Sequence, residues 1–328
     1  MTLEATIAPV QPYSLALSAR MKSDATRFLR DGILTVAYEA GGTPALARVS
    51  QRPDGKLDAW VESEEPAEAL AKLRFVLAAD DDHGEFLRRF RDDPLIGHAV
   101  RSQSGMRPIR TATVVHSLLK AVCGQLIDSR SARLLEAKLV RLACIKHDDF
   151  RLPPQRETFQ RFTRAELARH GLVSRKGSAL LRLTKELDLE RLHGVSTEVA
   201  AQRIERERGL GPWSAGMVCL YGLGRYECGL VGDLGLVKLV SAERGRWVET
   251  EETREILEPY GEWAGLASVY ILAGGRKERR DERHQVLHAQ LHRHRGQGAP
   301  ALPAGGRAPA STDPQRNRAS ALRPRAVG

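Results

Sequence analysis

The chain has 328 residues, of which 42% are apolar, 28% are charged and only 5% are aromatic. This length allows two or three domains with cores of their own and excludes a single small module. No stretch approaches the ~18 consecutive apolar residues of a membrane span, and the first residues lack a basic and then apolar secretion signal. We therefore expect a cytoplasmic protein with no membrane partner.

The formal net charge of +10 is distributed unevenly along the chain. Residues 276–328 hold 12 Lys and Arg against 4 Asp and Glu, which accounts for +8 and leaves only +2 for residues 1–275. This segment is poor in large apolar residues, and we predict a basic disordered tail. Its charge permits sequence-independent neutralisation of phosphates, and a tail without any role in binding is the open alternative.

An alternating pattern of apolar and polar residues marks the first 63 residues. The alternation predicts four strands: Tyr13–Ala19, Ile33–Glu39, Ala45–Ser50 and Leu57–Glu62. Turn signals at Gly41-Gly42 and at 52–55 separate these strands and favour antiparallel pairing. Helical spacing follows over Pro66–Leu77 and Glu85–Phe90. We predict an N-terminal antiparallel α+β domain over residues 1–92.

Helical periodicity dominates the chain from residue 93 to residue 275, with no convincing strand. Most of the expected helices open on a capping residue or a charge: Thr113–Gly124, Ala132–Ala143, Arg164–Arg169, Ser174–Leu187, Ser196–Arg206, Pro212–Leu223, Leu234–Ala242 and Glu262–Leu272. The predicted fold class is therefore α+β, an all-α body preceded by a small antiparallel sheet.

A glycine-rich turn, Gly209-Leu210-Gly211, separates two of these helices, and Pro212 follows it as a suitable first helical residue. Such a turn directs backbone N–H groups and the positive end of a helix dipole outward, which suits a phosphate oxygen. Taken alone, the turn is equally consistent with an ordinary helix connection.

Asp233 lies after a glycine-containing loop and immediately before an apolar helical run. The simplest role for such an aspartate is an N-cap, which stabilises a helix by about 1 kcal/mol. Capping is compatible with catalysis, because the helix N-terminus favours the ionised carboxylate.

The segment GLGPWSAG, followed by GDLGL with Asp233 20 positions after Trp213, resembles the signature of the helix-hairpin-helix DNA glycosylase superfamily, specifically the 3-methyladenine DNA glycosylase II branch. The resemblance covers about residues 8–275. It implies that Asp233 is catalytic and that the hairpin holds a DNA phosphate through Gly209, Leu210, Gly211, Ser214 and Ala215.

Two upstream segments extend the resemblance. SLLKAVCGQLID is similar to the family's helix ending in a Gly-Gln-aliphatic turn, which implies that Gln125 and Leu126 wedge into the gap left by an extruded base. GLVSRKGSALL resembles a Gly-Leu helix start with a lysine one turn later, matching Gly171 and Lys176, although a solvated lysine is the alternative. From the residues alone, each of these positions has an ordinary structural interpretation.

Lyase members of the superfamily carry a lysine nucleophile in the hairpin, where this chain has Trp213, so hydrolysis without strand cleavage is expected. We expect no cofactor. An iron-sulfur cluster is disfavoured because no cysteine follows Cys228, the last of Cys123, Cys144, Cys219 and Cys228. The family's hairpin can hold a monovalent cation, which the resemblance implies only near the carbonyls of Gly209 and Leu210.

Aromatic faces suit an electron-poor, cationic base, and the candidates for the base pocket are Trp213, Met217, Tyr260 and Trp263. Taken alone, each aromatic is more typical of a core than of a pocket. Met217 departs from the aromatic residue that the family commonly has there. The predicted function is that of a monofunctional base-excision repair glycosylase. We expect a monomer that flips alkylated purines of the 3-methyladenine and 7-methylguanine type out of double-stranded DNA and hydrolyses their N-glycosidic bond. The alternatives are a non-catalytic helix-hairpin-helix DNA-binding protein and a glycosylase for oxidised or deaminated bases.

Overall fold

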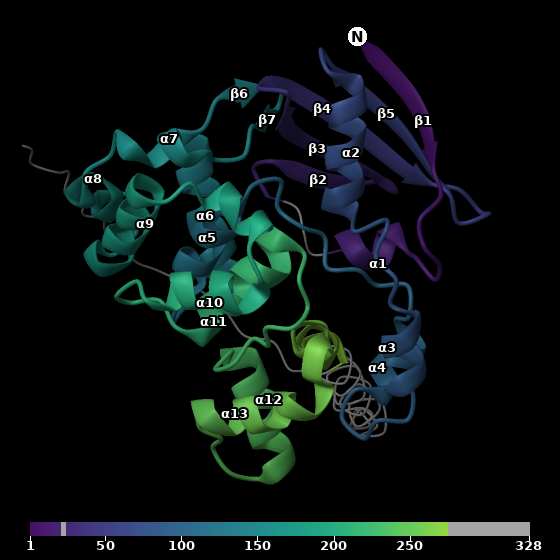
Figure 1. The fold of residues 1–328 in the computed structure, drawn as a ribbon, viewed down its shortest axis with the longest axis vertical. Helices are drawn as coiled ribbons and strands as arrows, with labels where there is room; N and C mark the ends of the chain where they lie inside the picture. The colour runs from purple at the N-terminus through teal and green to yellow at the C-terminus, as the bar shows by residue number, and fades with distance from the viewer. Residues whose placement is uncertain (21–23, 275–328) are drawn as a thin grey trace, which may run out of the picture. The chain divides into compact units, whose positions relative to one another are not determined.

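The computed structural model describes residues 1–20 and 24–274, which form an antiparallel sheet and a larger set of helices (Figure 1). The predicted α+β fold class is confirmed. The predicted tail over 276–328 lies outside the described residues. No helix within the described ranges combines the length and the apolarity that a membrane crossing needs.

The sheet has five strands in the order β1-β5-β4-β3-β2, and every neighbouring pair is antiparallel. The strands are β1 (Thr2–Ile7), β2 (Arg27–Arg30), β3 (Ile33–Ala40), β4 (Thr43–Gln51) and β5 (Leu57–Ser63). Helix α2 (Pro66–Leu77) covers one face, where Tyr38 donates its hydroxyl hydrogen to the carbonyl of Ala69. Three predicted strands are confirmed, whereas β1 and β2 were not predicted.

The predicted strand over Tyr13–Ala19 is wrong, because this segment forms helix α1 (Leu15–Ala19). Ser14 caps it by accepting the N–H of Leu17 at 3.3 Å. Leu15 and Ala19 are both buried. Alternation over only seven residues also places apolar side chains four positions apart, so the pattern fits one short helix as well as a strand.

The helical body surrounds α5 (Val114–Gly124), which is buried along most of its length and packs against α6, α9 and α11. The other elements of the body are α6 (Ser129–Ala143), α7 (Arg156–Gln160), α8 (Arg164–Arg169), α9 (Ser174–Glu186), η1 (Leu189–Gly194), α10 (Thr197–Glu205), α11 (Pro212–Val218) and the π-helical turn η2 (Cys219–Leu223). A two-residue strand pair, β6 (Lys146–His147) with β7 (Phe150–Arg151), lies where only helices were expected.

The sheet and α2 share one apolar core, and the helices around α5 share a second. A third apolar core joins two segments that are far apart in the sequence. Helices α3 (Gly84–Arg89) and α4 (Gly97–Ser102) pack with α12 (Leu234–Arg244), α13 (Thr250–Leu257), η3 (Glu258–Trp263) and the helical residues 264–274. The ring of Phe86 lies 5.1 Å from that of Tyr270, centroid to centroid. The predicted domain boundaries remain predictions.

Candidate active site

Asp233 occupies the N-cap position of α12, as the sequence indicates. Its Oδ1 accepts the backbone N–H groups of Gly235 at 2.7 Å and Leu236 at 3.2 Å. The side chain is only half-buried. Since a helix N-terminus favours a negative charge, the arrangement holds an anion at the protein surface.

The loop before Asp233 is held by two side chains that the sequence did not single out. The buried hydroxyl of Ser268 accepts the N–H of Leu230 at 3.0 Å, and the buried hydroxyl of Thr253 accepts the N–H of Gly232 at 2.7 Å. Gly232 has φ +78°, a left-handed conformation that favours glycine. These contacts fix the direction from which the chain enters α12.

Trp213 contacts the same carboxylate through its indole ring. Its Nε1–H donates to Oδ2 of Asp233 at 2.9 Å, so both carboxylate oxygens accept hydrogen bonds. The far edge of the ring lies against Gly124, where a Cβ would fall 2.7 Å from Trp213 Cη2. Glycine at the end of α5 therefore leaves the space that the indole occupies.

The hairpin between α10 and α11 has the predicted turn, with Gly209 at φ +98°. The N–H of Ala215 donates to the carbonyl of Gly211 at 3.1 Å, and that of Leu210 donates to Glu207 at 3.0 Å. These two predicted contact residues therefore already use their backbone donors.

Unused donors remain at the start of α11. Within the described ranges, the N–H groups of Gly211, Trp213 and Ser214 have no hydrogen-bond acceptor, as is usual in the first turn of a helix. The side chain of Ser214 is buried. The hairpin therefore presents backbone N–H groups rather than side chains.

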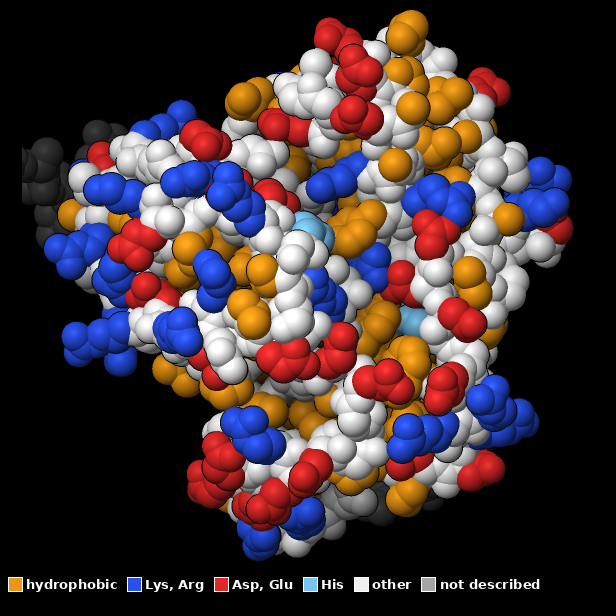
Figure 2. Space-filling model, in the orientation of Figure 1, with side chains coloured by type: hydrophobic (Ala, Val, Ile, Leu, Met, Phe, Trp, Pro, Cys, Tyr) orange, Lys and Arg blue, Asp and Glu red, His pale blue; other side chains and the backbone are white. Residues whose placement is uncertain are grey.

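Three exposed arginines precede this turn in the sequence, and a fourth, from α9, lies beside Gly209. They are Arg175, Arg203, Arg206 and Arg208, and none of the four has an ion-pair partner among the described residues. Figure 2 shows further Lys and Arg side chains over the part of the body that contains α8 and α9. Unpaired positive charge at a hairpin with free N–H groups favours an anionic partner.

The predicted wedge residues differ sharply in their surroundings. Leu126 is 96% exposed and has φ +57°. Gln125 is instead engaged, since its Nε2 donates to the carbonyl of Gly209 at 2.8 Å and to Oγ of Ser214 at 3.2 Å. Lys176 donates from Nζ to the backbone carbonyl of Gln125, so it is not merely a solvated charge.

The four predicted pocket residues all belong to one apolar core or pack against it. Tyr260 is buried, and its hydroxyl donates to Oδ1 of Asp93 at 3.0 Å. Trp263 stacks on Tyr226 with their centroids 6.1 Å apart. Trp213 and Met217 are partly buried against the third core. Of the four, Trp213 is hydrogen-bonded to Asp233.

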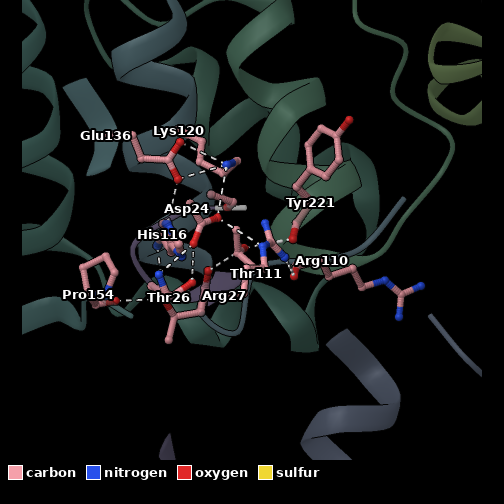
Figure 3. A network of polar contacts seen from close by, with 12 residues as sticks. Asp24, Thr26, Arg27, Arg110, Thr111, His116, Lys120, Glu136, Pro154 and Tyr221 are labelled. Atoms are coloured by element: carbon pink, nitrogen blue, oxygen red, sulfur yellow. Dashed lines mark hydrogen bonds and ion pairs between the residues drawn. The ribbon is translucent and has the colours of Figure 1, made fainter. Parts of the chain in front are cut away.

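Asp24, His116 and Glu136 have potential metal-ligand atoms within 4.8 Å of one another (Figure 3). Two cations already neutralise the two carboxylates. Lys120 Nζ lies 2.9 Å from Glu136 Oε1, and Arg27 Nε lies 3.1 Å from Asp24 Oδ2. The cluster is a buried ion-pair network that ties the start of β2 to α5 and α6.

The amino-acid sequence is similar to that of a known DNA glycosylase. The sequence is 24% identical over 276 residues to a DNA-3-methyladenine glycosylase of Bacillus subtilis (strain 168), a match that covers 79% of this chain and 91% of that protein. No protein-family model matches the chain.

Solved structures are similar over almost their whole length. The 3-methyladenine DNA glycosylase from Archaeoglobus fulgidus has a TM-score of 0.70 at 21% identity, covering 84% of this chain and 98% of that chain. The 8-oxoguanine glycosylase/lyase from Clostridium acetobutylicum, in complex with double-stranded DNA, has a TM-score of 0.68 at 17% identity, covering 85% and 98%. The chain has the fold of the helix-hairpin-helix DNA glycosylases. At these identities the likeness shows the fold alone.

Proposed function

We propose that the protein is a DNA glycosylase of base-excision repair that hydrolyses the N-glycosidic bond of alkylated purines of the 3-methyladenine and 7-methylguanine type. The observation that carries the proposal is the Asp233 carboxylate, held by two backbone N–H groups and the Trp213 indole N–H beside a hairpin with unused donors. The names of the similar proteins support it.

The proposed partner is double-stranded DNA containing a damaged base. The N–H groups at the start of α11 bind a phosphate, and the exposed arginines add sequence-independent attraction. The protein acts on one duplex as a cytoplasmic monomer. A damaged base is reached only after it leaves the stack, and Leu126 is the exposed apolar side chain suited to fill the resulting gap.

Asp233 supplies the chemistry. An alkylated purine is cationic and is therefore a good leaving group, so the remaining need is an anion near the sugar as positive charge develops there. The carboxylate meets this need by electrostatic stabilisation, and it orients the attacking water as a general base. Water adds to the anomeric carbon, the glycosidic bond breaks, and the free base and an abasic site result.

Trp213 distinguishes hydrolysis from lyase chemistry. An indole nitrogen cannot form the Schiff base that a hairpin lysine forms, and here its N–H is directed to Asp233. We therefore expect base release without strand cleavage. Trapping of a covalent protein–DNA complex by borohydride would contradict this part of the proposal.

Two other functions compete. A glycosylase for oxidised bases is favoured by the likeness to the fold of the 8-oxoguanine glycosylase/lyase. A lyase step is disfavoured, because Trp213 cannot form a Schiff base. A non-catalytic DNA-binding protein would use the same hairpin, but it would not require a carboxylate held by three donors.

Base release from methylated DNA tests the proposal directly. The wild-type protein should release 3-methyladenine and 7-methylguanine, and Asp233→Asn should reduce the single-turnover rate at least 100-fold, because it removes the charge while keeping a capping side chain. Asp188→Asn, at the exposed cap of η1, is the matched control and should retain the wild-type rate. Equal release by wild type and Asp233→Asn would refute the catalytic role.

A further inference from the structure

Leu126 combines two features that are each unfavourable. Its side chain is 96% exposed, and its backbone lies in the left-handed region at φ +57°. A residue with a Cβ is rare in that region, because the Cβ crowds the following carbonyl oxygen. Such a conformation persists only where the neighbouring chain determines it, so the contacts on both sides of Leu126 are informative.

On the C-terminal side, the chain is fixed by the start of α6. Asp128 Oδ1 accepts the N–H groups of Arg130 and Ser131, each at 3.0 Å. This is an ordinary helix cap. It anchors the chain two residues after Leu126.

On the N-terminal side, the contacts reach other parts of the fold. The Gln125 side-chain amide spans 84 residues of sequence to the carbonyl of Gly209 and also reaches Oγ of Ser214. Both acceptors belong to the hairpin. The backbone carbonyl of Gln125 accepts from Lys176 Nζ at the first turn of α9, and burial lowers the pKa of Lys176.

We propose that Gln125 and Lys176 are positioning residues that couple Leu126 to the hairpin. They keep the Leu126 side chain, which inserts into the duplex, at a fixed distance from the hairpin N–H groups that bind the phosphate. The proposal rests on the proposed function for its DNA substrate. Gln125 does not itself enter the stack, because its amide is already bonded to the hairpin. Leu126 alone enters it.

The readout is the preference for a duplex containing a tetrahydrofuran abasic-site analogue over an intact duplex, measured as the ratio of the two Kd values. Leu126→Ala should abolish most of this preference. Gln125→Met, which keeps side-chain length and removes both hydrogen bonds of the amide to the hairpin, should reduce the ratio about five- to tenfold. Affinity for the intact duplex should stay within about twofold, because the atoms that Gln125 bonds are not the backbone N–H groups that bind the phosphate.

A double-mutant cycle separates positioning from a merely structural role. If Gln125 acts through Leu126, then Gln125→Met should change the ratio by less than about twofold in the Leu126→Ala background. Lys176→Met should behave like Gln125→Met. Lys185→Met at the other end of α9 and the exposed Gln202→Met on α10 are the matched controls, and they should leave the ratio unchanged.

Additive effects of Gln125→Met and Leu126→Ala, an unchanged ratio in Gln125→Met, or a wild-type protein without abasic preference would each overturn the proposal. Base release is measured on the same proteins. A wild type that releases no base but shows the preference and the non-additive cycle would refute the proposed chemistry and support the coupling.

Discussion

The Asp233 carboxylate receives donors from two separate elements. The backbone of α12 supplies two N–H groups to Oδ1, and α11 supplies the indole of Trp213 to Oδ2. A hydrogen bond to a charged acceptor contributes about 1.5–3 kcal/mol. The two backbone contacts hold only one carboxylate oxygen and leave the carboxylate group free to rotate. The indole holds the other oxygen and thus fixes that rotation.

Trp213→Phe tests this role because it keeps an aromatic ring and removes the N–H. We expect the single-turnover rate of base release to fall about 10- to 100-fold, with little change in Kd for an abasic duplex. Trp247→Phe, at a ring that is 57% exposed, is the matched control. If Trp213→Phe weakens Kd and leaves the rate intact, the ring serves binding rather than carboxylate orientation.

Sequence reasoning reached some of these residues and not others. Asp233 was predictable as a cap because capping is local: an acidic residue precedes a helical run. The partners of Gln125 and Trp213 lie 84 and 20 residues away and depend on tertiary packing. Thr253 and Ser268 carried no signal, since a buried hydroxyl that accepts a loop N–H resembles any other helix serine or threonine.

Helix α11 approaches the loop before Asp233 more closely than any side chain would allow. A Cβ at Gly216 would lie 2.5 Å from the carbonyl oxygen of Gly229. Because that neighbour is backbone, it cannot move aside as a flexible side chain can. The small residue thus sets the separation between the helix that carries Trp213 and the loop that leads to Asp233.

Gly216→Ala should therefore lower the free energy of unfolding by about 1–3 kcal/mol, as overpacking does. It should also slow base release, because the two elements are forced apart. Gly194→Ala is the control, since a Cβ there meets nothing within 4 Å. Urea denaturation measures both variants, and a Gly216→Ala protein as stable as wild type would show that the contact relaxes freely.

Element by element, helices with long periodic patterns were predicted well, and α2 (Pro66–Leu77) matches in both bounds. Among the short elements, α8 (Arg164–Arg169) was predicted in both bounds, but the strands β1 and β2 were missed. Strand β1 (Thr2–Ile7) has few large apolar residues, and β2 (Arg27–Arg30) is flanked by charges, so neither shows a clear period of two. Their place in the sheet comes from pairing with β5 and β3.

Across the whole molecule, the buried ion network joins the sheet to the helical body. Burial alone would raise the pKa of Glu136. Lys120 and His116 lower it by more than burial raises it, so the pKa of Glu136 lies below its ordinary value. The pKa of Asp24 is also lowered, because the nearby charges of Arg27 and Lys120 outweigh the effect of burial. A carboxyl whose folded pKa lies below its unfolded value adds stability above the unfolded pKa and loses it as pH falls.

The free energy of unfolding should therefore decrease between about pH 5 and pH 3, around the unfolded carboxyl pKa values. Glu136→Gln leaves Lys120 without its nearest carboxylate and should lower stability at pH 7 by about 3 kcal/mol. Its stability should then depend less on pH in that window. The exposed Glu255→Gln is the control, and an unchanged pH dependence in Glu136→Gln would contradict this account.

The third core has a consequence for synthesis on the ribosome. The hydroxyl of Tyr260 bonds to Asp93 across 167 residues of sequence, and Phe86 and Phe90 pack beside it. At about 5–20 residues per second, the ribosome needs roughly 8–33 s to make the intervening chain. During that interval these two phenylalanines emerge without their final neighbours, so the segment 84–102 is a natural point of contact for a chaperone on the nascent chain.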